Sequence, residues 1–327
     1  MADIFGVRVT PELVVIDTLI ISNKIGGQVD PAVAFNDTNF IVVWADPGYD
    51  ESDAGIKVAR VTPQGAVLDT GHYVGTGNSE PDVAFGTNRC FVVWPQDFHG
   101  VRGRFVNSAG QPVDTAFDIA LATGSTTVPK VAFGDGNFLT VWSDFCSTGT
   151  DLDIYGQLVS SQGHLVGNKI TIADGSQNQN LPDCAFDGAN FVVVWSEGSD
   201  IFGRLIDNSG QPVGQQFRIS DNTPFIRGNP SMSVGMDNYF VTWDEYHDGF
   251  DIYGNVDIMI GVNEEEALPI AIEFIPSIIT QQLHLPNLDD FKIYDISGRR
   301  VELNQMIPGV YFIEVNHRVI RKVVKIR

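Results

Sequence analysis

One tryptophan-containing phrase recurs five times along this chain, and it constrains the fold more than any other feature. All five Trp residues of the protein end a segment related to V-A-F-x-x-x-N-F-x-V-V-W. They are spaced by 50, 48, 53 and 48 residues, at Trp44, Trp94, Trp142, Trp195 and Trp243. Self-similarity at a period of this length is typical of arrays built from one supersecondary unit. The chain is therefore expected to contain five similar units.

Each unit has four segments with the composition of β-strands. Residues 133–138 place Gly, Asp and Asn between aromatic residues, which predicts a hairpin ending in the Trp strand. A third strand of the pattern D-I-[FY]-G and a fourth strand follow. Four antiparallel strands per period predict an all-β fold, a five-bladed β-propeller of four-stranded blades spanning residues 1–262. The expected repeats are 29–77, 78–124, 125–175, 176–222, and 223–262 together with 3–22.

The third-strand segment occurs six times in the sequence, whereas the Trp phrase occurs five times. Copies of the third-strand segment lie near residues 3, 55, 100, 153, 200 and 251. A closed ring removes exposed sheet edges, so residues 13–22 are expected to be the outer strand of the blade that begins at Asn229. The surplus copy, Ile4 to Val9, would then add a fifth strand to that blade, replace residues 251–256, or pair with another copy of the chain.

The tryptophans and the repeated prolines are interpreted as structural. Each Trp sits at the same place in a V-V-W strand, which favours packing between blades over a sugar-stacking platform. A Pro is expected to begin every inner strand, because the first residue of a strand tolerates the missing N–H. Three cysteines are too few for a disulfide framework, and Cys184 replaces Val at its repeat position, as expected for a small buried apolar residue.

The charge of the chain limits its partners. A formal net charge of −21 repels nucleic acids and anionic membrane surfaces. No apolar run reaches the roughly 18 residues that a membrane span needs. The first residues, M-A-D-I-F-G, lack the charged and apolar regions of a signal peptide, so the chain is expected either to stay inside the cell or to have been trimmed.

Two sets of residues are candidates for binding. The loops after the Trp strands vary in length and are acidic, and Ca²⁺ prefers such oxygen ligands. A calcium site in these loops would use Asp46, Asp144, Asp153, Asp248 and Asp251. The sequence contains no D-x-D-x-D-G loop, so the favoured interpretation of these acids is that they cap turns and keep the protein soluble. The residues on either side of the repeated Pro differ between blades and are expected at the mouth of the propeller's axial channel. There they would form either a ligand site or a solvated lining of the channel, and they are Asp30, Glu80, Asp82, Lys130 and Asp183.

The sequence contains no decisive catalytic motif. A G-x-S-x-G elbow and an H-E-x-x-H pair are both missing. Asp82 and Asp183 could act as the paired carboxylates of a glycosidase, although no pattern singles them out. No catalytic residue is therefore assigned, and a non-catalytic protein is favoured.

Two resemblances suggest a cellular setting. Residues 1–260 resemble a bacterial extracellular propeller repeat of the form P-x-V-A-F-D-G-x-N-[FY]-x-V-V-W followed by D-I-[FY]-G, which implies a secreted or surface protein. Residues 271–327 follow an acidic linker at 263–270 and contain I-Y-D-I-S-G-R, P-G-V-Y-F and K-V-V-K-I. They resemble the C-terminal sorting domain of the type IX secretion system, expected here as a small β-sandwich, which implies export through that secretion machinery. F-I-P-S replaces the Y-P-N-P of that family at residues 274–277.

The predicted function is a secreted or cell-surface binding and structural scaffold, adhesin-like, that contacts a surface glycan or protein. The alternatives are a subunit of an extracellular assembly held by strand exchange through Ile4 to Val9, and a glycoside hydrolase or carbohydrate-binding propeller. The only cofactor that the sequence suggests is Ca²⁺.

Overall fold

A computed structural model shows an all-β protein. It describes residues 2–256 except 12–13, 49–53, 97–99, 122–126, 146–150, 222–223, 236–238 and 247–248. Beyond residue 256 it describes 278–279, 291–295, 299–302, 305–307, 309–315 and 318–325. No helix long and apolar enough to cross a membrane occurs in these ranges.

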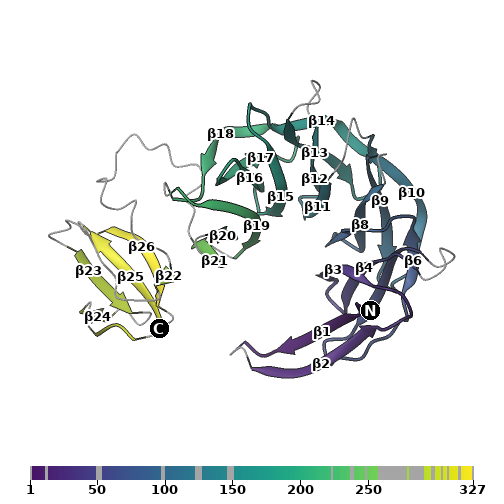
Figure 1. Cartoon of the computed structure of the whole chain (residues 1–327), viewed down its shortest axis with the longest axis horizontal. Helices are drawn as coiled ribbons and strands as arrows, with labels where there is room; N and C mark the ends of the chain where they lie inside the picture. The colour runs from purple at the N-terminus through teal and green to yellow at the C-terminus, as the bar shows by residue number, and fades with distance from the viewer. Residues whose placement is uncertain are drawn as a thin grey trace. The chain divides into compact units, whose positions relative to one another are not determined.

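Five sheets follow one another in chain order and correspond to the five predicted repeats (Figure 1). Blades 1 to 4 each have four antiparallel strands, as predicted, whereas blade 5 has three described strands. Blade 1 comprises β3 (Val29–Phe35), β4 (Phe40–Asp46), β5 (Gly55–Val61) and β6 (His72–Gly75); blade 2 comprises β7 (Asp82–Phe85), β8 (Arg89–Gln96), β9 (Gly100–Asn107) and β10 (Pro112–Ala120). Blade 3 comprises β11 (Thr127–Gly134), β12 (Asn137–Phe145), β13 (Leu152–Ser160) and β14 (Leu165–Ala173); blade 4 comprises β15 (Gln179–Phe186), β16 (Phe191–Glu197), β17 (Asp200–Ile206) and β18 (Pro212–Arg218). Blade 5 comprises β19 (Ile226–Val234), β20 (Tyr239–Tyr246) and β21 (Phe250–Val256).

The chain divides into two compact units. The first contains residues 1–198 and 204–215, and the second contains residues 199–203 and 216–327.

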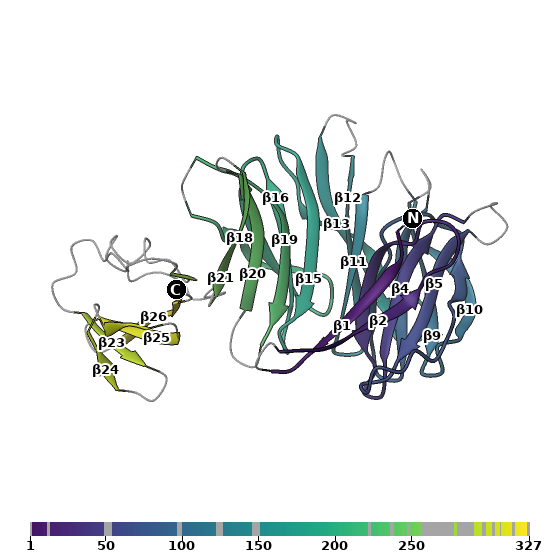
Figure 2. The same cartoon turned by 60° about the horizontal axis from the view of Figure 1, so that its bottom comes forward.

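The first strands of the chain form a hairpin of their own. Strand β1 (Ile4–Val9) pairs antiparallel with β2 (Val15–Ser22), with Gly6 opposite Leu19. The surplus third-strand copy thus pairs with the fourth-strand segment that follows it. Ile4 and Ile21 of this hairpin pack against blade 1, and Figure 2 shows β1 and β2 beside β4 and β5. The predicted pairing of residues 13–22 with the blade that begins at Asn229 does not occur among the strand ladders of the described residues, so ring closure by this strand stays a prediction.

The five tryptophans are buried, and Trp94 and Trp142 lie at contacts between neighbouring blades. Their side chains lie between 0% and 7% exposed, which confirms packing and leaves no face for a sugar. Trp94 packs against Ile56, Val58 and Val74 of blade 1 within one buried cluster. The cysteines that the structure describes, Cys90 and Cys184, are buried free thiols, as expected of small apolar residues.

The C-terminal residues form one described sheet. Its order is β22 (Ile278–Ile279), β26 (Arg318–Lys325), β25 (Gly309–Val315), β23 (Phe291–Asp295) and β24 (Arg300–Val301). The segments I-Y-D, G-V-Y-F and K-V-V-K, which the resemblance assigns to a β-sandwich, lie in strands β23, β25 and β26. A second layer, which the expected sandwich requires, is not among the described residues, and the acidic linker at 263–270 lies outside them.

Candidate functional site

The first candidate site lies on the inner strands, the first strand of each blade. A β-bulge interrupts the pairing of these strands beside the repeated Pro in blades 1, 3, 4 and 5. The residue before Pro has a positive φ in four blades, at Asp30 (53°), Glu80 (45°), Leu181 (53°) and Asn229 (48°). Non-glycine residues rarely adopt this conformation, and bulges of this kind redirect side chains. The register shifts and the positive φ thus aim these side chains differently from those of a regular strand.

Carboxylates on the inner strands connect neighbouring blades. Asp30 Oδ2 of blade 1 accepts a hydrogen bond from the Glu80 N–H of blade 2 at 3.2 Å. Asp82 Oδ2 of blade 2 accepts one from the Val131 N–H of blade 3 at 2.8 Å. Each of these carboxylates therefore accepts a hydrogen bond from a backbone N–H of the next blade and helps to hold neighbouring blades together.

Electrostatic interactions show that the predicted inner-strand residues lie near one another. Burial raises the pKa of the Asp82 carboxyl to about 6, with Lys130 opposing the shift and Asp183 adding to it. Burial also raises the pKa of Glu80, with Asp30 adding to the shift and Lys130 opposing it. We call Asp30, Glu80, Asp82, Lys130 and Asp183 the inner-strand cluster; it combines four acids with one base.

We expect Asp82→Asn to stabilise the protein near pH 7.5 and to leave its stability almost unchanged near pH 4. The folded-state pKa of about 6 exceeds the ordinary value of 3.8, so the folded state favours the protonated carboxyl. The stability that this protonation provides is lost as pH rises from about 4 to about 6. Asn removes the ionisation and keeps an oxygen for the Val131 N–H, so urea denaturation should show a gain of about 2 kcal/mol at the higher pH.

Asp114→Asn is the matched control, because the Asp114 side chain is 74% exposed on the outer strand β10. Its effect should be small at both pH values. An Asp82→Asn variant with the same change in stability at pH 4 and pH 7.5 would contradict the assignment.

The residues predicted to bind calcium do not assemble into a metal site where the structure describes them. No group of three or more His, Cys, Asp or Glu residues suited to a metal occurs in the described ranges. Asp144 and Asp153 lie opposite each other on β12 and β13, at 1% and 5% exposure. Asp46 is buried, Asp251 is exposed, and Asp248 lies outside the described residues, so a calcium site stays a prediction.

The acidic residue two positions after Trp has a structural role. Glu197 and Glu245 accept hydrogen bonds from the indole N–H of Trp195 and Trp243, at 3.2 and 3.3 Å. Asp46 accepts one from the Gly48 N–H, which is the turn capping expected from the sequence. Because Asp46 and Glu245 are buried, these two acids satisfy internal donors.

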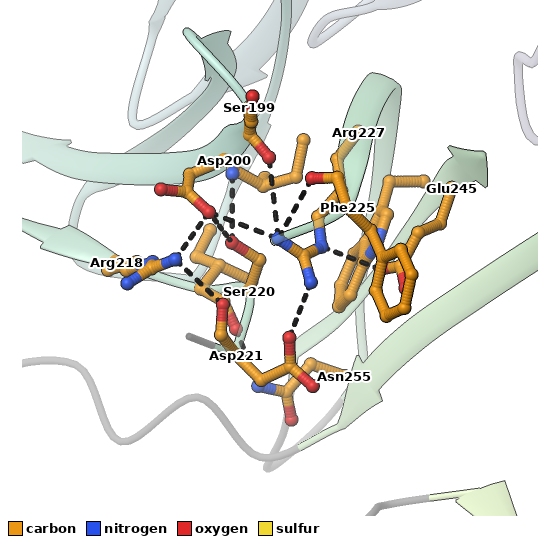
Figure 3. A network of polar contacts seen from close by, with 12 residues as sticks. Ser199, Asp200, Arg218, Ser220, Asp221, Phe225, Arg227, Glu245 and Asn255 are labelled. Atoms are coloured by element: carbon orange, nitrogen blue, oxygen red, sulfur yellow. Dashed lines mark hydrogen bonds and ion pairs between the residues drawn. The ribbon is translucent and has the colours of Figure 1, made fainter. Parts of the chain in front are cut away.

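The second unit contains a polar network around Arg227 that the sequence did not indicate (Figure 3). The Arg227 side chain is 0% exposed. Its Nε donates to Glu245 Oε2 at 2.6 Å, its Nη1 to Asp200 Oδ1 at 3.1 Å, and its Nη2 to Asp221. Arg218 contacts Asp200 as well and donates to the Asp221 carbonyl at 2.8 Å.

The network connects the start of β17 with β19 and β20. Three carboxylates surround one buried guanidinium, and a buried charge is tolerated only when it is paired in this way. The only signal in the sequence is the place of Arg227 three residues before the repeated Pro, where Gln28 and Gln179 of other blades are also buried. All three guanidinium nitrogens of Arg227 donate to carboxylates of the protein, so we interpret this network as a structural centre.

Comparison with known proteins identifies no family. No family model matches the sequence, and no curated protein matches it. Several solved structures resemble the chain. One is a thermostable family-43 glycoside hydrolase with 16% sequence identity and a TM-score of 0.44; the similarity covers 72% of this chain and 91% of that chain. An endo-arabinanase from Bacillus licheniformis has 13% identity, coverage of 72% and 95%, and a TM-score of 0.40. A subtype N10 neuraminidase-like protein of the isolate A/little yellow-shouldered bat/Guatemala/060/2010 has 10% identity, coverage of 70% of this chain and 82% of that chain, and a TM-score of 0.48. Likenesses at this level do not show an activity for this chain.

Proposed function

We propose that this protein is a carbohydrate-active β-propeller that cleaves glycosidic bonds at the inner-strand cluster. The observation that carries the proposal is the Asp82 carboxyl, which the Val131 N–H holds at 2.8 Å and whose pKa is raised to about 6 by burial, with the charge of Asp183 adding to the shift. Glycoside hydrolysis needs one carboxyl that holds a proton near neutral pH and a second that is ionised. Glycoside hydrolases are among the solved structures of similar fold, which agrees with the proposal without carrying it.

Asp82 is the proposed general acid. Its Oδ2 accepts the hydrogen bond from Val131, which fixes the carboxyl, and the raised pKa lets it donate a proton to the departing glycosidic oxygen. Asp183 is the proposed second carboxylate, because its charge is coupled to Asp82. Lys130 moderates the pKa of Asp82 and would contact sugar hydroxyl groups through its ammonium.

The test is hydrolysis of a panel of neutral polysaccharides and aryl glycosides by the full chain. Asp82→Asn should lower kcat by at least about 100-fold, because general acid catalysis contributes that much. Asp183→Asn should lower kcat as well, and the exposed Asp114→Asn variant should retain the activity of the unaltered protein. A substrate that is cleaved equally fast by Asp82→Asn and by the unaltered protein would refute the assignment.

The second candidate is the adhesin-like scaffold that binds a surface glycan or protein without cleaving it. The observation in its favour is that Asp30 and Asp82 accept hydrogen bonds from backbone donors of the next blade, a role that requires no catalysis. A glycan array would support it if ligands bind and none is hydrolysed. An extracellular or outer-surface location, with export through residues 271–327, belongs to both candidates and rests on the sequence resemblance alone.

A further inference from the structure

The acids of the Arg227 network recur one repeat earlier in the chain, without the arginine. Arg227 lies three residues before its Pro, and Gln179 has that place in blade 4. The three acids have counterparts at the same repeat positions, namely Asp153 for Asp200, Asp174 for Asp221 and Glu197 for Glu245. We call Asp153, Asp174, Gln179 and Glu197 the junction site; all four belong to the first unit. A neutral amide thus stands where a guanidinium pairs with acids in Figure 3.

The pairing of the strands is the same at both places. Arg227 lies directly opposite Glu245 on the neighbouring strand, and its Nε donates to that carboxylate at 2.6 Å. Gln179 lies directly opposite Glu197. The two positions are therefore equivalent in the fold as well as in the sequence.

The amide of Gln179 is buried and held in one orientation. The residue is 0% exposed, and its Nε2 donates to the Gln177 carbonyl at 2.6 Å. This bond directs Oε1 away from that carbonyl, and Oε1 has no hydrogen-bond partner within the described ranges. A buried acceptor without a donor is costly, so a group that binds Oε1 is expected here.

Asp153 presents a second unpartnered oxygen beside Gln179. It is 5% exposed, and its Oδ2 accepts the Tyr155 hydroxyl at 2.9 Å. Its Oδ1 has no hydrogen-bond partner in the part of the chain that the structure describes. The two side chains meet at Gly175, whose N–H hydrogen-bonds the Asp153 carboxyl and at which a Cβ would stand 3.1 Å from Gln179 Nε2.

The charge around Asp153 is negative. Burial raises the pKa of its carboxyl, and the charges of Asp174 and Asp151 raise it further. A buried carboxylate is tolerated when a positive charge is paired with it. Arg227 supplies that charge to the corresponding acids, whereas Gln179 does not. The junction site therefore has the electrostatics of a cation site.

The start of blade 1 shows that the open oxygen belongs to this repeat position. Gln28 lies three residues before its Pro and is 1% exposed. Its Nε2 donates to the Lys24 carbonyl at 3.1 Å, and its Oε1 has no hydrogen-bond partner among the described residues either. Glutamine at this position thus presents a buried oxygen in two different blades.

We propose that the junction site binds one metal cation through Asp153 Oδ1 and Gln179 Oε1, in the role that the Arg227 guanidinium has in its own network. Ca²⁺ fits these donors, because it accepts carboxylate and amide oxygens together with waters in a flexible geometry, whereas Mg²⁺ demands a near-ideal octahedron. The site shares only Asp153 with the loop acids that the sequence suggests for calcium.

The expected affinity is low. Within the described ranges no group of three or more His, Cys, Asp or Glu residues could hold a metal. One carboxylate oxygen and one amide oxygen leave the remaining coordination positions to water. The dissociation constant for Ca²⁺ should therefore be about 0.1–1 mM, at the weak end of the range of calcium sites in proteins.

Thermal denaturation of the full chain, stripped of metal with EDTA and dialysed, tests the proposal. Titration with CaCl₂ to 10 mM should raise the melting temperature by a few degrees, because a ligand that binds only the folded state stabilises it. MgCl₂ and NaCl at equal ionic strength measure the general effect of salt on a chain with a net charge of −21, and they should raise it less. Isothermal titration calorimetry should show about one Ca²⁺ site per chain.

Two variants and a control locate the site. Gln179→Arg supplies a guanidinium, so it should melt above the unaltered protein without Ca²⁺ and gain no more from Ca²⁺ than from Mg²⁺. Asp153→Asn removes the charged ligand and should also lose the specific Ca²⁺ response. Asp114→Asn, whose side chain is exposed on β10, is the matched control and should respond like the unaltered protein.

An unaltered protein that gains no more stability from Ca²⁺ than from Mg²⁺ or Na⁺ overturns the proposal. A calorimetric Ca²⁺ site that persists in Asp153→Asn, with circular dichroism showing that variant folded, overturns it as well. Asp153→Asn decides the question alone if Gln179→Arg does not fold.

Discussion

Arg227→Met will destabilise the protein by about 3–5 kcal/mol, because it leaves the buried Glu245 carboxylate without its counter-charge. Nε and Nη1 of Arg227 contact Glu245 and Asp200 directly, and the guanidinium is fully buried. Met has a similar length, so the change removes the charge and the donors more than it removes volume. Chemical denaturation followed by tryptophan fluorescence measures the loss, because Trp243 shares Glu245 as a hydrogen-bond partner.

Two further variants separate the charge effect from packing. Arg218→Met, whose side chain is 30% exposed, should cost no more than about 1 kcal/mol. Glu245→Gln in the Arg227→Met background should recover part of the lost stability, because it removes one of the unpaired charges. A loss below 1 kcal/mol for Arg227→Met would show that water reaches the carboxylates.

Trp94→Ala will cost about 3–5 kcal/mol, the range observed when a buried aromatic side chain is truncated. The indole is 0% exposed and its N–H donates to the Thr76 carbonyl at 2.7 Å. Gly75 and Gly77 lie so close that a Cβ at either would stand 2.6 Å from the ring. Removing the indole therefore creates a cavity between blades 1 and 2 and leaves a carbonyl without its donor.

Thermal and urea denaturation measure this loss, and two variants calibrate it. Leu121→Ala, at 74% exposure, should change stability by less than about 0.5 kcal/mol. Trp94→Phe should fall between the two, because it fills part of the cavity. If Trp94→Ala were as stable as Leu121→Ala, the interpretation of the tryptophans as packing residues would be wrong.

The inner-strand cluster was partly predictable. The repeat places Asp82, Lys130 and Asp183 at one position of successive inner strands, so the sequence brings them to the same part of the fold. It contains no signal for the depth at which Asp82 lies, and that depth raises its pKa. The positive φ of Glu80 and Asp30 was equally hidden, because propensity alone does not place a carboxylate residue in the left-handed region.

The sequence by itself determined the unit of this protein: a strand pattern repeated about every 50 residues, with Trp at a position that is buried in all five copies. Period-two alternation and turn residues are local properties, and local properties can be read from the chain. Only the tertiary structure decided which residues pair across blades. Arg227 contacts Asp200 and Asp221, and Asp82 accepts the Val131 N–H, because such contacts depend on the distance between segments in space, which no local pattern encodes.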